Sequence, residues 1–343
     1  MNQLFRHKQA IIFSLIAVLL AILFISLYTT QFTVQGDERT IATATRAKVI
    51  DTYVRNFEKY AESSLKIATY RNLDILTKEK ITDHTFYADE EEFKSTFMNC
   101  TTCGYINCES APAMICSPDG KNFGVEQFLN NISQLAKAHM NINTTYAITI
   151  QKIEQDSPFE VKVTAQIMYV VSDMVDANNF RWNKTTIIIA TVPIDGLFDP
   201  LTSIYTNGSY NYSITPTTLC KFNESCWNIT TTTQFYRAQE FRYMPNATAY
   251  LPRFWNDNTL SSCCGIEALL NITKLNVTEN NSYVDHEFWT GMHICNETDP
   301  TTQTIIEFTT IDPSTHFRLD DNAAARYNIA GNGVQVCNPN PIP

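Results

Sequence analysis

Residues 49–68, VIDTYVRNFEKYAESSLKIA, decide the fold of the N-terminal half of this chain. Apolar and small side chains recur there at steps of three and four residues, while charged side chains occupy the opposite positions. This period is that of an α-helix with one buried face. The face predicted to be buried consists of Val49, Ile50, Tyr53, Val54, Phe57, Tyr60, Ala61, Ser64, Leu65 and Ala68, and the opposite face carries Asp51, Arg55, Lys59, Glu62 and Lys66.

The helix is expected to be longer than an ordinary globular helix. Its pattern runs from Glu38 to about Leu76, there is no glycine between Gly36 and Gly104, and the first proline is Pro112. We therefore interpret residues 31–80 as a helical stalk. Its apolar face could pack on the chain's own globular domain, or residues 38–76 could self-associate with copies of the chain. The stripe does not follow strict heptads, which slightly favours the first arrangement.

An uninterrupted apolar segment precedes the stalk. Ala10 to Tyr28 reads AIIFSLIAVLLAILFISLY, nineteen residues without a charge, and spans about 28 Å as a helix. That length matches the hydrocarbon core of a bilayer. Arg6 and Lys8 precede it, so the positive-inside rule predicts a cytoplasmic tail (1–8), a transmembrane anchor in contact with the lipid bilayer (9–30) and an extracellular remainder. A cleaved secretory signal is disfavoured, because no A-x-A site follows Tyr28.

All ten cysteines follow residue 99, on the predicted outer side, where an even number favours a disulfide framework. Local pairs are expected within residues 100–116 and between Cys220 and Cys226. The adjacent Cys263 and Cys264 are expected to reach two different partners. A zinc site at residues 100–116 is disfavoured, because paired C-x2-C modules are missing. The disulfide candidates are Cys100, Cys103, Cys108, Cys116, Cys220, Cys226, Cys263, Cys264, Cys295 and Cys337.

Asn-x-Ser/Thr sequons are frequent in the same region. There are thirteen, and none precedes residue 99, which indicates N-linked glycans on an extracellular surface. The candidate acceptors are Asn99, Asn131, Asn143, Asn183, Asn207, Asn211, Asn223, Asn228, Asn246, Asn271, Asn276, Asn280 and Asn296.

The globular part is predicted to be α+β and disulfide-rich. Residues 81–121 read as a cysteine-rich loop segment, and 122–200 as a helix followed by an antiparallel sheet. The helix should bury Phe123, Val125, Phe128, Ile132 and Leu135, and the strands are expected at 146–153, 159–171 and 185–192. Residues 201–343 form a cysteine- and sequon-rich extension, with a helix opening at 263–270 and a strand at 304–310.

The Lys8-Gln9-Ala10 start, the apolar helix, the amphipathic continuation and the antiparallel strands resemble archaeal type IV pilin-like proteins. AESSLKIATYRNLDIL (61–76), RWNKTTIIIATVPIDGLFDPL (181–201) and SCCGIEALLNI (262–272) are similar to segments of uncharacterised single-pass archaeal surface proteins of that type. The resemblance implies an anchored extracellular structural protein with a prepilin peptidase site between Lys8 and Gln9. The chain lacks the glycine usual before that site, and Phe13 replaces the glutamate usual at the fifth mature position.

No motif for catalysis is present. The chain lacks a nucleophile elbow, a Walker loop, a Rossmann fingerprint and an HExxH motif, so no catalytic residue, metal ligand or cofactor is assigned. His286, Glu287, His293 and Cys295 form the densest potential ligand group, but their spacing matches no zinc hydrolase. Asp320 and Asp321 are expected to point apart and to be solvated. The net charge of −10 and the scattered basic residues argue against nucleic acid as a partner.

These features favour a non-enzymatic, membrane-anchored extracellular glycoprotein with a structural or adhesive role at the cell surface. One alternative is an anchored extracytoplasmic enzyme, such as a hydrolase, without a recognisable motif. Another is a viral envelope attachment glycoprotein, because dense sequons and disulfides also suit that class.

Overall fold

The computed structural model describes residues 38–106, 116, 122–175, 180–210, 212–221, 224–257, 259–271, 275, 281–290, 304–312 and 317–337. Within them helices and antiparallel strands are mixed, so the predicted α+β class is confirmed. The predicted tail (1–8), the anchor (9–30), Cys108, His293 and Cys295 lie outside the described residues. None of the described helices is both long enough and apolar enough to cross a membrane.

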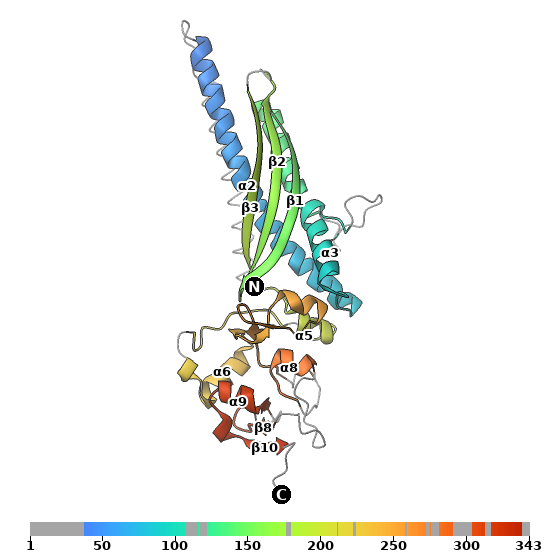
Figure 1. The fold of residues 1–343 in the computed structure, drawn as a ribbon, viewed down its shortest axis with the longest axis vertical. Coiled ribbons are helices and arrows are strands. Elements are labelled where there is room, and N and C mark those ends of the chain that lie inside the picture. The colour runs from blue at the N-terminus through green and yellow to red at the C-terminus, as the bar shows by residue number, and fades with distance from the viewer. Residues whose placement is uncertain are drawn as a thin grey trace. The chain divides into compact units, whose positions relative to one another are not determined.

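The chain divides into two compact units. The first contains Met1–Ser64, Val125–Thr149 and Ala165–Ile188, and the second contains Leu65–Gly124, Ile150–Thr164 and Ile189–Pro343. The division runs through helix α2 (Glu38–Asp83) and through the sheet formed by β1 (Ile142–Ser157), β2 (Glu160–Asp173) and β3 (Arg181–Pro193). The sheet has the order β1-β2-β3 (Figure 1).

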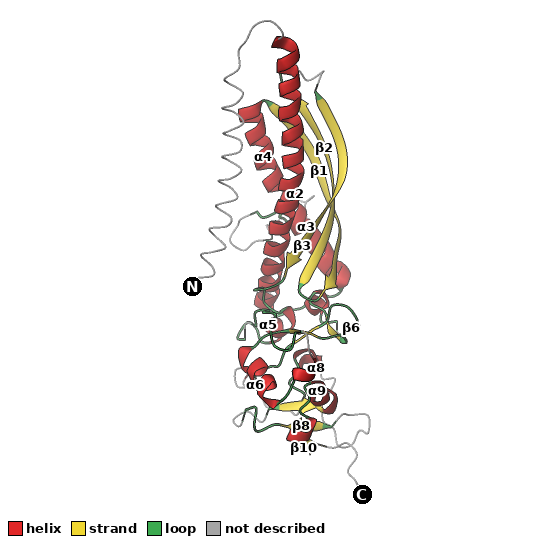
Figure 2. Ribbon diagram, turned by 90° about the vertical axis from the view of Figure 1, so that its left-hand side faces the viewer, coloured by secondary structure: helices red, strands yellow, loops and turns green. Residues whose placement is uncertain are grey.

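In the first unit, α2 and α4 (Val125–Met140) lie on one face of this sheet (Figure 2). The Tyr53 hydroxyl is 2.9 Å from the Thr144 hydroxyl of β1. Phe57 meets Tyr169 of β2 edge to face, with ring centroids 5.4 Å apart. The alternative in which the apolar stripe packs on the chain's own domain is therefore the one observed. In this unit Ile50, Tyr53, Val54, Phe57, Ala61 and Ser64 are buried, and Val49 and Tyr60 are half-buried. Leu65 and Ala68 of the same stripe are buried in the second unit.

Arg46 joins α2 to the end of β2 in this unit. Its Nε lies 2.8 Å from Asp173 Oδ2 and its Nη2 2.9 Å from Asp173 Oδ1, so the pair is bidentate. Nη2 also donates to the Met140 carbonyl at 2.7 Å. One side chain thus connects α2, α4 and β2 in a geometry that lysine could not reproduce.

The predicted face of α4 is only partly correct. Val125 and Ile132 are buried, but Leu135 is 38% exposed and Leu129 is buried in its stead. Ser133 completes the buried face, because its hydroxyl donates to the Leu129 carbonyl within the same helix. The helix is therefore rotated slightly from the face that apolar residues alone predict, which is possible because Ser133 satisfies its own hydroxyl.

The sequence predicted residues 81–121 to be a loop segment. This prediction is wrong for part of the segment, because α3 (Glu90–Cys103) lies within it. Asp89 starts the helix by accepting a hydrogen bond from the Glu92 amide at 2.8 Å, and Glu92 in turn accepts from the Ala88 amide at 2.6 Å. Gly104 ends it at φ +80°, a conformation that favours glycine. These capping signals outweigh the loop-like run of cysteine, threonine and asparagine.

The second unit contains short elements: α5 (Pro200–Tyr205), η1 (Glu224–Cys226), α6 (Ile229–Ala238), η2 (Leu251–Trp255), α8 (Asp285–Thr290), α9 (Asp321–Arg326) and η3 (Ala330–Asn332). Its strands pair in three small sheets, with the orders β10-β8-β9, β4-β7 and β5-β6. The strands are β4 (Arg242–Tyr243), β5 (Ala247–Thr248), β6 (Leu260–Ser261), β7 (Ile266–Glu267), β8 (Ile305–Glu307), β9 (Arg318–Asp320) and β10 (Val334–Cys337). The strand predicted at 304–310 is confirmed by β8.

The helix predicted to open at residues 263–270 is wrong, because β7 and an isolated bridge at Leu269 occupy this segment. Gly265 explains the difference. A Cβ added there would lie 2.4 Å from the carbonyl oxygens of both Met244 and Ala247. The backbone at Gly265 therefore packs directly against a neighbouring turn, which only glycine allows. The apolar run has a helix-like sequence pattern but adopts an extended conformation.

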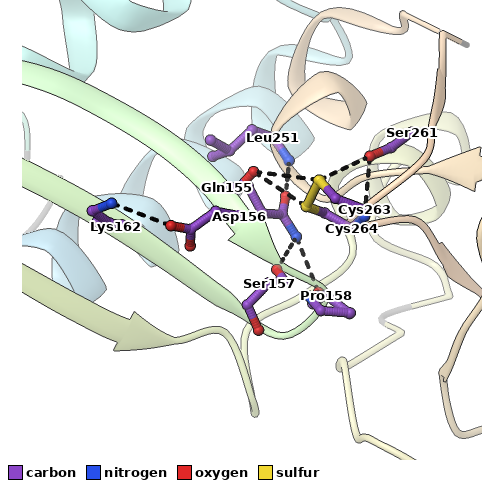
Figure 3. Close-up of a disulfide and its surroundings, with 9 residues drawn as sticks. All are labelled: Gln155, Asp156, Ser157, Pro158, Lys162, Leu251, Ser261, Cys263 and Cys264. Atoms are coloured by element: carbon purple, nitrogen blue, oxygen red, sulfur yellow. Dashed lines mark hydrogen bonds and ion pairs between the residues drawn. A yellow bond between two sulfur atoms is a disulfide. The ribbon is translucent and has the colours of Figure 1, made fainter.

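Three disulfides join described cysteines. Cys220 bonds Cys226 as expected, and Cys100 bonds Cys116, which is one local pair within residues 100–116. Cys263 and Cys264 were predicted to bond two different partners. This prediction is wrong, because they bond to each other (Figure 3). Residues 262–264 form a turn between β6 and β7, and the two neighbouring side chains meet in this turn, which regular helix or strand would not allow.

Candidate functional site

Ionisable side chains and one serine gather in the interior of the second unit. They come from segments far apart in the sequence, and all are buried except Arg326, whose side chain is 30% exposed. Charged groups are rarely buried unless each has a partner. We call this group the buried charge cluster, and it consists of Asp199, Arg242, Arg253, Glu267, Ser282, Asp285, His286, Glu287, Asp320, Arg326 and Tyr327.

Arg253 of η2 organises one half of the cluster. Its Nη1 donates to Asp199 Oδ1 at 3.0 Å and to Asp285 Oδ2 at 2.6 Å, and its side chain is fully buried. Asp199 also caps α5 by accepting from the Thr202 amide at 3.0 Å. Burial disfavours the Asp285 carboxylate, but the charge of Arg253 and the hydrogen bond from His286 outweigh burial and lower the pKa of Asp285 to about 2.

Glu267 of β7 organises the other half. Its Oε1 accepts from Arg242 Nη2 at 2.8 Å and from the Tyr327 hydroxyl at 2.8 Å, and its Oε2 accepts from Arg326 Nη2 at 3.1 Å. Burial raises the pKa of Glu267, but the charges of Arg326 and Arg242 lower it more, so the net shift is downward. The Arg242 guanidinium also lies 4.0 Å from the Tyr327 ring centroid, which places a cation over an aromatic face.

The third part of the cluster is a pair of carboxyl groups around one hydroxyl. Ser282 Oγ lies 2.8 Å from Glu287 Oε2 and 2.8 Å from Asp320 Oδ2. A serine hydroxyl has a single proton and can donate to only one of them. Burial and the nearby Asp320 carboxylate raise the pKa of Glu287 well above its ordinary value. We infer that Glu287 holds the second proton and that Asp320 stays ionised, since its Oδ1 accepts from the Ala323 amide at the start of α9.

The cluster contains residues with metal-ligand chemistry. Glu267, His286 and Glu287 each place one ligand atom within 4.8 Å of the others, and all three are buried. Arg326 already bridges the two glutamates, because its Nη2 lies 3.1 Å from Glu267 Oε2 and 3.0 Å from Glu287 Oε1. A metal ion would have to displace this guanidinium. The arrangement is therefore best described as a buried ion-pair network in which each charged group faces a partner.

The structure changes the interpretation of the candidate residues at 285–321. Asp320 and Asp321 point apart as expected, but only Asp321 is exposed, because Asp320 is fully buried in the cluster. His286 contacts Asp285, with Nδ1 3.2 Å from Oδ1, and lies near Glu267, which the sequence did not single out. Sequence reasoning also missed Arg242, Arg253 and Arg326. The available signal was a charge inside an apolar run, as in IEALL (266–270) and LPRFW (251–255).

The asparagines of the described sequons differ in their exposure to solvent. Asn131, Asn183, Asn207, Asn228 and Asn246 are exposed, whereas Asn99, Asn143 and Asn271 are partly buried. Asn228 is exposed but occupied, since its Oδ1 caps α6 and its Nδ2 donates to the Cys226 carbonyl at 3.1 Å. The remaining candidates, Asn211, Asn223, Asn276, Asn280 and Asn296, lie outside the described residues.

The remaining described cysteines are also oxidised. Cys103 is disulfide-bonded, and none of the described cysteines is a free thiol. Cys337 ends strand β10. Because Cys100 is bonded to Cys116, these two sulfurs are not available to the zinc arrangement considered for residues 100–116.

Comparison with family models, with curated proteins and with solved structures finds no match to this chain.

Proposed function

We propose that the chain is a membrane-anchored extracellular glycoprotein with a structural or adhesive role at the cell surface. The observation that carries this proposal is the oxidised state of the described cysteines, none of which is a free thiol. Disulfides persist in oxidising compartments and are rare in the cytosol. This is the compartment that an N-terminal anchor with a cytoplasmic tail would assign to residues 31–343.

The positions of the sequons support the same proposal. Asn183 lies on β3, and both Asn183 and Thr185 of its sequon are exposed. Asn207 and Asn246 are also exposed, and both lie in turns with positive φ, +51° and +72°. These acceptors are accessible on the folded surface, as N-linked glycosylation of a surface protein requires.

The layout supports a pilin-like architecture as part of the proposal. The first unit places the N-terminal part of α2 along the antiparallel sheet, and a helix followed by antiparallel strands is the order on which the resemblance rests. The described part of α2 uses its apolar stripe inside the chain, so association between copies would use other surfaces. The buried charge cluster gives the enzyme alternative no specific support, since its acids and bases are engaged with one another.

Protease accessibility, which reports membrane topology, and glycosidase sensitivity, which reports glycosylation, test the proposal together. The full-length protein is expressed in cells that carry out N-glycosylation, and intact cells are treated with a protease that cannot enter. We expect the ectodomain to be degraded and, in a parallel sample, a glycosidase to shift its mobility. Thr185→Ala is the matched control, because it removes one sequon and leaves Asn183 in place. An unglycosylated chain protected from external protease would contradict the proposal.

Electron microscopy tests the structural role. We expect the purified full-length protein, or the cell surface that carries it, to show filaments or ordered arrays. A monomeric and evenly dispersed protein would count against a pilin-like assembly while leaving the anchored topology intact.

A further inference from the structure

The bond between Cys263 and Cys264 differs in kind from the other disulfides. Cys100 and Cys116 are separated by 16 positions and Cys220 and Cys226 by 6, whereas Cys263 and Cys264 are adjacent. A disulfide stabilises a fold chiefly by restricting the unfolded chain, and this effect grows with the length of the closed loop. A bond between neighbours closes almost no loop. Cross-linking of distant segments therefore cannot be its role.

The two sulfurs have unequal access to solvent. Cys263 is exposed, while Cys264 is fully buried. In thiol–disulfide exchange a thiolate attacks one sulfur and expels the other as a leaving group. An external thiol can approach Cys263 Sγ, and the buried Cys264 Sγ would then leave. The geometry fixes which sulfur is attacked.

Polar partners are in place for both sulfurs in a reduced state. Cys264 Sγ lies 3.3 Å from the Gln155 carbonyl oxygen, and after reduction its S–H could donate to that oxygen (Figure 3). Ser261 Oγ accepts from the Cys264 amide at 3.1 Å and lies 3.6 Å from Cys263 Sγ. Its hydroxyl proton can therefore be directed to a Cys263 thiolate. The local structure suits the dithiol as well as the disulfide.

The same residue, Gln155, connects the sulfurs to their surroundings within the second unit. Its Nε2 donates to the carbonyls of Ser157 and Pro158 at 3.1 and 3.0 Å, and its Oε1 accepts from the Leu251 amide at 3.2 Å. These contacts do not involve the sulfur atoms. Opening the disulfide would thus leave the β1–β2 turn and η2 connected through the Gln155 side chain.

We propose that Cys263–Cys264 is a reversible redox site that exchanges with a dithiol reductant, while Cys100–Cys116 stays oxidised. A thiolate of the reductant attacks Cys263 Sγ, a mixed disulfide forms, and the Cys263–Cys264 bond breaks. Cys264 leaves as a thiolate and takes up a proton. The second thiol of the reductant then attacks its own sulfur in the mixed disulfide and releases Cys263. Two electrons and two protons pass from the dithiol to the protein.

Mass spectrometry of the full-length protein tests the site. A digest without reduction should contain one peptide in which Cys263 and Cys264 are joined to each other. After graded dithiothreitol treatment and alkylation, these two cysteines should be labelled at a concentration at least about tenfold lower than Cys100, Cys116, Cys220 or Cys226. Oxidised glutathione should restore the joined peptide. Linkage of either residue to another cysteine, labelling no earlier than the others, or failure to reoxidise would each overturn the proposal.

A second measurement uses the adjacency of the thiols. The reduced protein should bind one equivalent of phenylarsine oxide, which requires two neighbouring thiols, and Cys264→Ser should bind none there. The double variant Cys263→Ser/Cys264→Ser should unfold at the same urea concentration as the wild type, because no loop is lost. Cys100→Ser/Cys116→Ser serves as the comparison and should unfold at a lower concentration. An equal loss in both double variants would mean that the Cys263–Cys264 bond is structural.

Discussion

Asp285 and Glu287 lie two positions apart in α8, yet their surroundings move their pKa values in opposite directions. Asp285 faces Arg253 and is held as a carboxylate. Glu287 faces the Asp320 carboxylate and the Ser282 hydroxyl, and is held as a neutral acid although Arg326 lies 3.0 Å away. The identity of the neighbour, rather than burial alone, decides the protonation of each group.

Asp285→Asn should lower the free energy of unfolding by about 3–5 kcal/mol, because it leaves the buried Arg253 with half of its counter-charge. The pKa of Asp285 is depressed, so its stabilising contribution is present above the ordinary value of 3.8 and is lost as the pH falls through about 2. Urea unfolding of the full-length protein between pH 2 and 7 measures both effects. Asp321→Asn, which removes an exposed carboxylate in α9, is the control and should change little.

Glu287→Gln should change the pH dependence in the opposite sense. The pKa of Glu287 is raised above 4.5, so its contribution is fully present below that value and is lost as the pH rises through its folded pKa. Glutamine keeps a donor for Asp320 and cannot ionise. The variant should therefore gain stability relative to the wild type as the pH is raised from 4.5 to 8. Parallel stability curves over this range would show that Glu287 is not protonated in the folded protein.

At the scale of elements, helix caps and sequons share some of the same residues. Asn228 caps α6 through hydrogen bonds from the Thr230 and Thr231 amides at 2.9 and 3.1 Å, and the Thr231 hydroxyl accepts from the Asn228 amide in return. This reciprocal arrangement is a capping box. A sequon can therefore be exposed and still have its asparagine committed to the fold.

Glycan occupancy should differ between Asn228 and Asn183. The side-chain nitrogen of Asn228, Nδ2, donates to the Cys226 carbonyl, whereas Asn183 and Thr185 are exposed along β3. We expect high occupancy at Asn183 and low occupancy at Asn228, measured as the ratio of modified to unmodified peptide by mass spectrometry. Equal occupancy at both would mean that glycosylation precedes formation of the α6 cap.

Removal of the α3 cap tests why this helix forms. Asp89→Ala should destabilise the protein by about 1 kcal/mol, since the Glu92 amide loses its acceptor. Glu91→Ala removes an exposed acid from the same helical turn without touching the cap, and should cost less. Thermal unfolding followed by circular dichroism compares the two variants. A larger effect at Glu91 would assign the helix start to charge rather than to capping.

At the scale of the whole molecule, the mature N-terminus separates two forms of the proposed anchor. An uncleaved signal anchor keeps Met1, whereas pilin-type processing would leave Gln9 as the first residue. The absent glycine and the Phe13 at the fifth mature position favour the first. We expect intact-protein mass spectrometry to find Met1 and the protein to remain in the membrane after alkaline extraction. A chain starting at Gln9 would contradict the simple anchor.

The sequence by itself determined the features that depend on local patterns. The three- and four-residue period predicted α2, and alternation predicted β1, β2 and β3, because burial of one face imposes these periods directly. Proximity along the chain predicted local pairing within residues 100–116 and the Cys220–Cys226 bond, but it did not predict which cysteine of 100–116 bonds which.

Only the tertiary structure decided the features that depend on neighbours far away in the sequence. Gly265 lies against Met244 and Ala247, which turned a helix-like run into strand. The buried charge cluster unites Asp199, Arg253 and Asp285, and no sequence spacing relates these residues. Cys263 and Cys264 bond to each other because a turn brings them together, although adjacency in sequence indicated separate partners. For Gly265 and the buried charge cluster, the deciding energy is a contact, burial or ion pair that exists only once distant segments have met.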